Sequence, residues 1–391
     1  MKPSLNILIG AGFSYLAKLP LGNELKAKFD RDLREQLLRH SGSEWTWKEG
    51  KDSATVNNGS VGADWISYSF VLNEVLEAYK SDRGAFNDYE DFYQFIKDHS
   101  GNDNWYRPLF DRAKTKMYSE LVMQSPNEFF DPIFSMPNTF LIEEIINYLI
   151  ADVLWTTKTD AELLEAYRPF IEYIKTFDEV NIFTLNHDLL LERLFKISGL
   201  TYCDGFSAEN SILKYQDSLL PTFKCAFDSA PIKIHKLHGS IDTFLFAHCE
   251  ENVAVLTRTE LYSYFKPINY QSKHYVERID PVTNTVIQHF SADTIVPRFI
   301  TGNGENKKAF IEADYMYSQL YNRFVGKMKK GKNLLIVGYS FRDEHVNDVL
   351  KLFTKTDGPK VINLNPSDVF KYDVPWIKEI KAFSELPLEQ K

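Results

Sequence analysis

The sequence is poor in cysteine. Its 391 residues include Cys203, Cys225 and Cys249, and no two of these are spaced as a CxxC pair. Counting alone therefore excludes a four-cysteine zinc ribbon. A disulfide framework is not expected either, because such frameworks are dense in cysteine and belong to small secreted domains. We expect a cytoplasmic chain without a metal centre.

Long apolar runs are also missing. A helix that spans a bilayer needs about 20 consecutive apolar residues, and no segment of the chain has them. Residues 140–155 are apolar, but Glu143, Glu144 and Asp152 interrupt them at helical spacing, which is typical of a core helix. Residues 6–9 predict a strand that runs into a glycine turn, so we expect neither a secretory leader nor a membrane anchor.

Basic charge is in deficit. The chain has 45 Lys and Arg against 54 Asp and Glu, which gives a net charge of −9 and a pI of about 5.6. Proteins that grip nucleic acid by its phosphates usually present a basic face, so we expect no direct nucleic-acid binding. The densest basic run, Lys327 to Lys332, indicates the solvated end of a helix. A nuclease is disfavoured by this charge balance and by the lack of a carboxylate cluster.

The sequence does contain the apolar and aromatic residues of a core. The hydrophobic share is 44%, with 29 Phe and 21 Tyr, which is typical of a folded globular protein. Near the N-terminus, Leu5 to Ile9 predict a strand, Gly10-Ala11-Gly12 a turn, and Asn23 to Glu35 a helix. A strand, a glycine turn and a helix in this order open a nucleotide-binding α/β fold.

A long helical block interrupts this pattern. From about residue 31 to residue 177 the periodicity is mostly helical, apart from a polar loop over residues 41–62. The predicted helices cover residues 64–80, 88–99, 105–124, 139–155 and 161–177. We predict an α/β, Rossmann-like parallel-sheet domain formed by residues 1–30 and 178–391, and a helical module inserted as residues 31–177.

Strand-like runs return after this block. Short apolar runs bounded by turn residues are typical of buried parallel strands. The predicted strands cover residues 180–184, 232–237, 333–337 and 360–364, with added strands at 242–247 and 253–256; helices are predicted at 189–198, 315–330 and 343–354.

Glycine and serine follow the first predicted strand, at the end where α/β folds bind ligands. Gly10, Ala11, Gly12 and Ser14 form a turn of the kind whose backbone approaches a pyrophosphate. A short glycine turn in such a fold is purely structural about as often.

The segment Thr184-Leu185-Asn186-His187-Asp188 follows the next strand. In extended geometry Asn186 and Asp188 face the same way, so one could hold a hydroxyl or a water and the other could accept from an amide. Alternatively, Asp188 caps the helix that follows, and taken by itself this interpretation is the better one.

His238 and Gly239 follow the strand over residues 232–237. A histidine at a strand end is well placed as a general base, because its ordinary pKa is near neutral pH. The other histidines considered, His187, His235, His248 and His345, are interpreted as packed or exposed side chains.

Two further strand ends carry small or polar residues. Gly338-Tyr339-Ser340 follows residues 333–337 and is either a second phosphate-binding turn or a plain one. Asn363 lies in the last predicted strand and could bond a ribose hydroxyl or start the turn before Pro366.

The order of these motifs resembles the sirtuin family. GAG-x-S, T-x-N-x-D, HG, G-x-S and INL occur in the family's own order, over residues 1–28 and about 178–375. The resemblance implies a fold that binds NAD as a substrate. It implies that the turn residues Gly10, Ala11, Gly12 and Ser14 hold the pyrophosphate, Thr184 contacts the cofactor, Asn186 orients water or the nicotinamide ribose, Asp188 binds the carboxamide, His238 acts as the base, Gly338 and Ser340 contact phosphate or ribose, and Asn363 bonds the adenosine ribose.

The chain also departs from the family's pattern. It cannot carry the family's zinc module, Leu185 stands where a glutamine usually precedes the asparagine, and no segment after His238 matches the one that pairs with an acyl-lysine peptide. The run from Gly338 to His345 instead resembles the zinc-free bacterial sirtuin-like group, which is associated with anti-phage defence. Its members destroy NAD, and short standalone members resemble partners of HerA-type hexameric ATPases.

We therefore predict an NAD+ glycohydrolase without a metal, the effector of an anti-phage, abortive-infection system. Restraint of its activity implies a homo-oligomer or a HerA-type ATPase partner, with the helical block as the contact surface. The alternative is an NAD or ADP-ribose sensor or scaffold without turnover. Protein deacylation and ADP-ribosyl transfer are weaker alternatives, since the zinc ligands are missing.

Overall fold

The structure is a computed structural model. It describes residues 3–20, 24–25, 38–41, 44–47, 63–86, 89–120, 139–228, 230–248, 261–269, 272–273, 275–289, 297–302, 304–353, 360–365 and 377–387. Its contacts divide the chain into two units. Unit 1 comprises Met1–Leu21, Leu154–Ile300 and Gly304–Lys391, and unit 2 comprises Gly22–Val153 and Thr301–Asn303.

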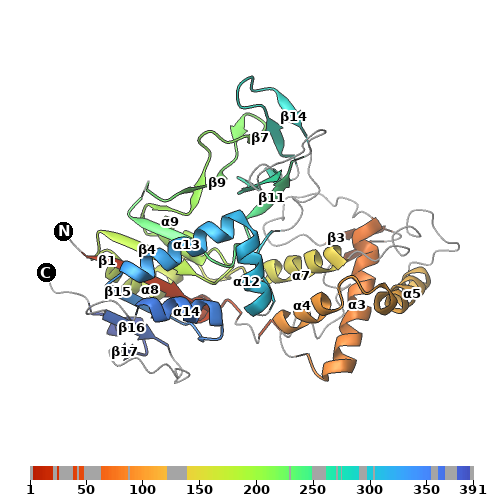
Figure 1. Cartoon of the computed structure of the whole chain (residues 1–391), viewed down its shortest axis with the longest axis horizontal. Helices are drawn as coiled ribbons and strands as arrows, with labels where there is room; N and C mark the ends of the chain where they lie inside the picture. Colours follow the sequence, from red (N-terminus) through yellow and green to blue (C-terminus); the bar gives the residue numbers. More distant parts are fainter. Residues whose placement is uncertain are drawn as a thin grey trace. The chain divides into compact units, whose positions relative to one another are not determined.

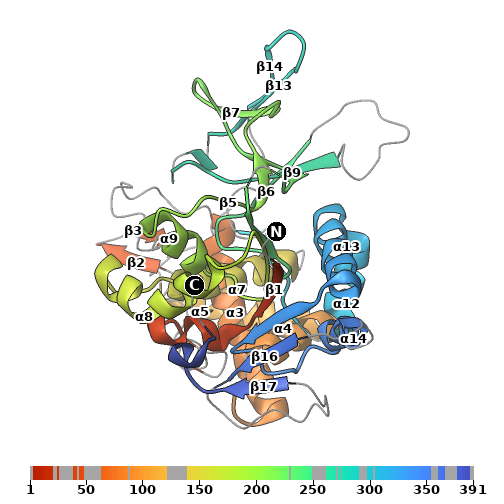
Figure 2. The ribbon, with the colours of Figure 1, turned by 90° about the vertical axis from the view of Figure 1, so that its left-hand side faces the viewer.

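A seven-stranded parallel sheet forms the centre of unit 1 (Figures 1 and 2). Its order is β17-β16-β15-β1-β4-β10-β5, and every neighbouring pair is parallel. The strands are β1 (Ser4–Ile9), β4 (Glu179–Thr184), β5 (Tyr202–Cys203), β10 (Ile232–Lys236), β15 (Asn333–Val337), β16 (Lys360–Leu364) and β17 (Ile377–Ile380). The predicted α/β class with a parallel sheet is confirmed.

Alternation of side chains along each strand buries both faces of the sheet. Ile7 and Ile9 of β1 share a core with α8 (Asp160–Ile174), α9 (Leu190–Ile197) and the short 3-10 helix η1 (Ala11–Ala17). Leu8 points to the other face, into a core with α12 (Gly304–Ala313), α13 (Tyr315–Lys330) and α14 (Glu344–Phe353). The helices lie on the two faces as Figure 2 shows.

Helix α8 belongs to unit 1, whereas residues 161–177 were expected in the inserted block. Leu163, Tyr167 and Phe170 of α8 pack in the same core as β1, and the Tyr167 hydroxyl donates to the Phe13 carbonyl at 2.6 Å. Helical periodicity alone does not say which layer a helix covers, so unit 1 resumes at Leu154 and not at residue 178.

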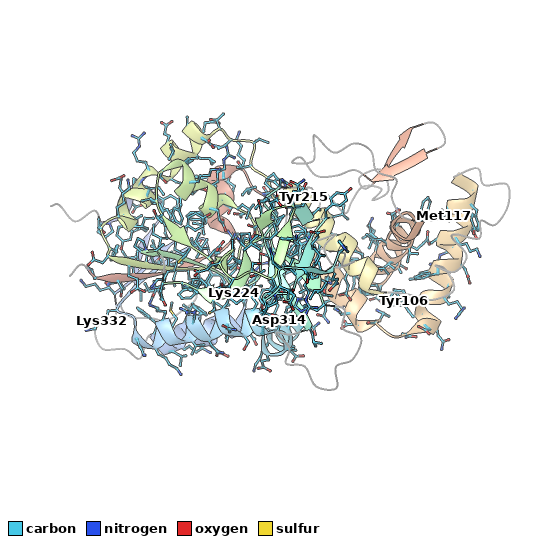
Figure 3. All side chains as sticks on the ribbon, turned by 90° about the horizontal axis from the view of Figure 1, so that it is seen from above. Tyr106, Met117, Tyr215, Lys224, Asp314 and Lys332 are labelled. Carbon is cyan, nitrogen blue, oxygen red and sulfur yellow. The ribbon has the colours of Figure 1, made fainter. Side chains whose placement is uncertain are left out.

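Unit 2 is mainly helical. It contains α3 (Ala63–Arg83), α4 (Tyr89–Asp98), α5 (Asp103–Glu120) and α7 (Thr139–Val153). Aromatic side chains fill its core, and Figure 3 labels Tyr106 and Met117 of α5, which are both buried. A hairpin of β2 (Leu38–Ser41) and β3 (Glu44–Trp47) lies where helix and loop were expected. Of the helix expected over residues 23–35, only Glu24 and Leu25 are described, and they form a turn; the rest lies outside the described residues.

Two small antiparallel sheets extend unit 1 between β5 and α12. One has the order β11-β12-β9-β6 and the other β14-β13-β7-β8. Their strands are β6 (Gly205–Ser207), β7 (Leu213–Tyr215), β8 (Ser218–Leu219), β9 (Thr222–Ala226), β11 (Phe244–Ala247), β12 (Tyr262–Phe265), β13 (Glu277–Ile279) and β14 (Val286–Gln288). Of these, β11 alone was expected; the strand expected over 253–256 lies outside the described residues.

Asp314 joins α13 to one of these sheets. Its Oδ1 accepts from the backbone of Met316 and Tyr317, and its Oδ2 accepts from the hydroxyls of Tyr262 and Tyr264. One carboxylate thus caps the helix and fixes β12. Within the described ranges, no helix has the length and apolar character needed to cross a bilayer.

His235 of β10 is a buried polar residue without a partner. Its ring stacks on Phe183 at 4.6 Å and lies 4.2 Å from the Phe227 ring, and within the described part of the chain neither ring nitrogen has a hydrogen bond. Burial lowers the pKa of His235 well below its ordinary value, with smaller contributions from Arg323, Lys327 and Lys233. The folded protein therefore loses stability as the pH falls below the ordinary pKa of histidine, because the unfolded chain then binds a proton at this residue that the folded chain does not.

We predict that His235→Phe stabilises the protein and reduces its sensitivity to acid. Removing two unpartnered buried nitrogens should raise the unfolding free energy by about 1 kcal/mol at neutral pH. Below pH ~6.5 the unfolded imidazole binds a proton that the folded one does not, so this residue alone costs the wild type about 1.4 kcal/mol per pH unit. Urea unfolding at several pH values measures both effects.

The matched control is His289→Phe, because the His289 side chain is 77% exposed. This variant should leave the pH dependence as in the wild type. If the unfolding free energies of His235→Phe and the wild type depend on pH equally, His235 is not a buried neutral histidine that lowers stability in acid.

Candidate functional site

The carboxyl ends of the parallel strands bring the predicted motifs to one edge of the sheet. The loops after β1, β4, β10 and β15, which are adjacent in the sheet, all leave at this edge. After β1 the chain enters η1 on the α8 and α9 face, and after β15 it enters α14 on the opposite face. Such a reversal of direction between neighbouring strands is where α/β folds bind ligands.

The two glycine turns at this reversal pack backbone to backbone. The N–H of Gly10 donates to the Val337 carbonyl at 3.0 Å, and the N–H of Gly12 donates to the Gly338 carbonyl at 2.9 Å. A Cβ on Gly10 would lie 2.7 Å from the Gly338 oxygen, and a Cβ on Gly338 would lie 2.4 Å from the Gly12 carbonyl carbon. These two amides hold the turns together and are not directed at a ligand.

Ser14, Asn186 and Asp188 form a polar cluster beside this contact. The Ser14 hydroxyl donates to Asp188 Oδ2 at 2.7 Å, and Asn186 Nδ2 donates to Ser14 Oγ at 3.0 Å. Asp188 Oδ1 accepts from the backbone N–H of Leu190 at 3.0 Å, at the start of α9. The N-cap of α9 is Leu189, without a side-chain cap, so the capping alternative does not describe Asp188. Its Oδ1 fixes the turn into the helix, and its Oδ2 fixes the serine of the first turn.

Asn186 is held on one side and open on the other. Its backbone N–H donates to Thr184 Oγ1 at 3.1 Å, and its Nδ2 also donates to the Gly10 carbonyl at 3.1 Å. Among the described residues, none donates a hydrogen bond to Asn186 Oδ1, and the side chain is half-buried. The orientation of the amide follows from the two acceptors of Nδ2, the Gly10 carbonyl and Ser14 Oγ, so Oδ1 is an acceptor presented at the strand edge.

His238 is buried at the end of β10, with 4% of its surface exposed. Its Nε2 lies 3.4 Å from Nε2 of His345. Burial lowers the pKa of His238 well below its ordinary value, and the nearby Lys307 ammonium adds to this. The imidazole is therefore neutral at neutral pH, which a general base must be, although a lowered pKa also weakens it as a base.

Three residues near His238 were not predicted as site residues. His345 was interpreted as a packed or exposed histidine; it is buried, and its Nε2 faces that of His238. Asp343 precedes α14, and its Oδ1 accepts from the buried Lys307 Nζ at 2.9 Å. Asp343 and His345 stand in the run GYSFRDEH, so their spacing was a usable signal, whereas Lys307 lies in α12 and no motif marks it.

The remaining predicted site residues lie in different surroundings. Ala11 and Ser340 are exposed in the two turns, and Thr184 is buried at the end of β4. Asn363 is buried within β16, opposite Ile336, and its Oδ1 has no partner among the described residues. Asn365 stands at the strand end instead, where its Nδ2 donates to the Tyr339 carbonyl at 2.9 Å.

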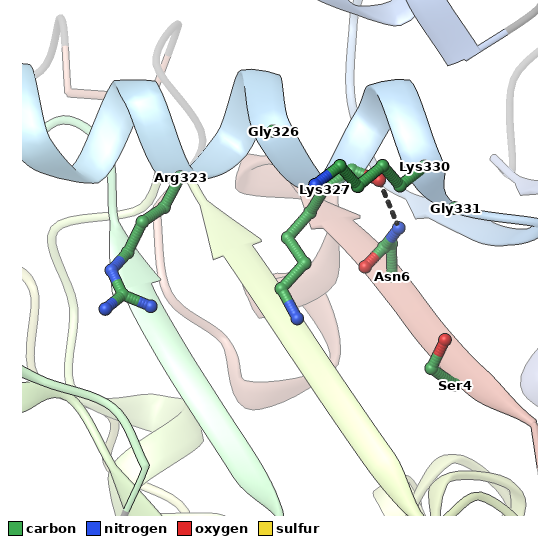
Figure 4. Close-up of a pocket in the computed structure, with 7 residues that line it drawn as sticks. All are labelled: Ser4, Asn6, Arg323, Gly326, Lys327, Lys330 and Gly331. Carbon is green, nitrogen blue, oxygen red and sulfur yellow. Dashed lines mark hydrogen bonds between the residues drawn. The ribbon is translucent and has the colours of Figure 1, made fainter.

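A hollow of about 390 Å³ lies at the opposite edge of the sheet, where β1 begins (Figure 4). Its charged lining comes from the last turns of α13, namely Arg323, Lys327 and Lys330. Lys327 pairs with Glu179 at 2.6 Å, and this contact is the main reason that the pKa of Glu179 falls to about 2. Lys327 and Lys330 thus lie at the end of a helix, as expected for the basic run, and none of the sequence motifs lines this hollow.

One family model matches part of the chain. Residues 180–369 match the family model described as the SIR2-like domain, a range that contains the loops after β4, β10 and β15. The solved structures with similarity include a complex of Sir2, a p53 peptide and NAD+ (13% identity, 98% of this chain, 90% of that chain, TM-score 0.31). A structure on sirtuin substrate affinity (12%, 98%, 90%, 0.33) and Sir2Tm bound to a propionylated peptide (12%, 98%, 90%, 0.31) are similar at the same level. Among curated proteins the comparison finds no match.

We predict that Gly338→Ala destabilises unit 1 through the contact of the two turns. Gly338 has φ +59, and its new Cβ would overlap the Gly12 backbone. The left-handed backbone and the overlap together should cost about 3 kcal/mol, measured by urea unfolding. Gly326→Ala is the control, because a Cβ there meets nothing within 4 Å and the helix should gain up to about 1 kcal/mol. Unchanged stability of Gly338→Ala would show that the turns do not depend on this contact.

Proposed function

We propose that the chain hydrolyses NAD+ at the carboxyl edge of its sheet and releases nicotinamide and ADP-ribose. The observation that carries the proposal is the pairing of a free acceptor with a neutral base at the ends of two adjacent strands. Asn186 Oδ1 follows β4, and the buried imidazole of His238 follows β10. Both residues lie within the range that matches the SIR2-like domain.

Cleavage of the bond between nicotinamide and ribose needs no general acid. The nicotinamide of NAD+ is already cationic, so it departs as a neutral molecule while positive charge develops on the ribose. Asn186 Oδ1 would orient the attacking water or a ribose hydroxyl, and His238 would take up the proton that is released. Water oxygen then bonds to the anomeric carbon, and the products are nicotinamide and ADP-ribose.

The turns after β1 and β15 would receive the phosphates and riboses. Since the N–H groups of Gly10 and Gly12 bond to the carbonyls of Val337 and Gly338, these glycines would act by letting the two turns pack closely and not as donors to the ligand. The exposed Ala11 and Ser340 would meet the ligand directly, beside Gly338, while Ser14 and Thr184 hold Asp188 and Asn186 in place. The unpartnered Oδ1 of Asn363 suits a ribose hydroxyl donor.

We further propose that this activity serves anti-phage defence by abortive infection, under restraint by a homo-oligomer or a HerA-type ATPase. The resemblance of the run from Gly338 to His345 to the defence group supports this. Residues 31–177 would provide the contact surface. Co-elution with a candidate ATPase tests the idea, and a truncation of these residues that still assembles would contradict it.

A binding role without turnover is the second candidate. It is favoured by the mutual hydrogen bonds of Ser14, Asn186 and Asp188, which leave few polar atoms free for chemistry. Calorimetry that shows NAD binding without nicotinamide release would support this sensor role. Deacylation and ADP-ribosyl transfer remain weaker candidates, because three cysteines cannot form the zinc module of protein-deacylating relatives.

We predict that Asn186→Ala and His238→Ala each lower NAD+ hydrolysis by about 100-fold or more, because each removes a group that acts in the transition state. Chromatography of nicotinamide and ADP-ribose measures the rate, with the protein alone and with an ATPase partner. His289→Ala, a surface histidine, is the control and should keep full activity. Full activity of both site variants would refute the assignment.

A further inference from the structure

His238, His345 and Asp343 have the donor set of a transition-metal site. One ligand atom from each residue lies within 4.8 Å of the others. The two imidazoles are buried, and Asp343 is half-buried. Two imidazoles and one carboxylate suit Zn²⁺ and its neighbours such as Co²⁺, and suit Mg²⁺ and Ca²⁺ poorly, since the latter prefer oxygen ligands.

The distance between the two histidines fits such an ion. Zn–N bonds of about 2.0–2.1 Å at a tetrahedral angle place two nitrogens about 3.3–3.4 Å apart. His238 Nε2 and His345 Nε2 are 3.4 Å apart, which is long for a hydrogen bond between two ring nitrogens. The rings would need little rearrangement to share an ion between them.

We propose that His238, His345 and Asp343 bind Zn²⁺ or a similar transition-metal ion, which engages the nitrogen of His238 and so blocks the site. Three protein ligands leave a fourth position for water. A neutral imidazole offers one lone-pair nitrogen to a metal ion, and the facing Nε2 atoms of His238 and His345 are placed to offer theirs. That the three residues bind a metal ion follows from their arrangement alone. That the ion blocks the site rests on the proposed NAD+ hydrolysis.

The positive charge of Lys307 competes with a metal ion for Asp343 and therefore lowers the affinity of the site for the ion. The Lys307 Nζ is 2.9 Å from Asp343 Oδ1, and the lysine side chain is 4% exposed. Asp343 is therefore already paired with a buried ammonium. A metal ion must share Asp343 with this ammonium or displace it. The site is thus built for reversible occupancy, in contrast to a structural zinc site.

Cobalt titration of the full-length protein, after treatment with a chelator, tests the proposal. We expect one Co²⁺ per chain, with visible d–d absorption of a four- or five-coordinate ion and without a thiolate charge-transfer band. His345→Ala, and separately the conservative His345→Gln, should weaken binding at least about 100-fold, since even outer ligand partners contribute 10–100-fold. Lys307→Met should strengthen it at least about tenfold, because it removes the competing charge.

The controls separate this site from other ligands. His289→Ala should bind Co²⁺ as the wild type does, and circular dichroism checks that each variant is folded. Absent binding, a thiolate band, or binding that His345→Ala and His345→Gln leave unchanged would overturn the proposal.

Inhibition provides the second measurement. Zn²⁺ should stop NAD+ hydrolysis, and a chelator should restore it. Hydrolysis that persists with the site filled would show that the ion lies away from His238. If the protein hydrolyses no NAD+ under any condition, the cobalt spectrum still decides the metal site, so failure of the proposed function is distinguishable.

Discussion

The contact between the two glycine turns is the constraint on which the rest of the site depends. Because Gly10 and Gly12 bond to the carbonyls of Val337 and Gly338, β1 and β15 end at the same level although their chains leave toward opposite faces. Ser14 is thereby placed where it bonds Asp188, and the Gly10 carbonyl receives Asn186 Nδ2. A side chain at either turn would separate the strands and move the loop after β4 with them.

Much of the sheet could be predicted because its strands are short apolar runs bounded by turn residues, as in Leu334 to Val337. What periodicity could not supply is the partner of each element. Helix α8 has the same amphipathic pattern whether it covers the sheet or joins a helical module, and its aromatic residues decide for the sheet. The strands of the two small antiparallel sheets have two to five residues each, too few to show a period of two, and β11 alone among them was expected.

The candidate site was predictable where chemistry and strand ends coincide, and not where distant segments meet. Asn186 and His238 follow strands, so the parallel sheet brings them together. Lys307 comes from α12 and reaches Asp343 through packing that no local pattern encodes. Glycine turns are ambiguous for another reason: the residue that lets a phosphate approach also lets another backbone approach, and here the second use is realised.

The setting of His238 bears on the order of events in the proposed reaction. A buried imidazole beside an ammonium is neutral, as a base must be, but it accepts a proton reluctantly. Such a base suits a reaction in which nicotinamide departs first, because the water that attacks a developing ribose cation becomes acidic only as its bond to carbon forms. Proton transfer would then follow bond breaking. A reaction that needs a strong base to create its nucleophile beforehand would be poorly served by this histidine.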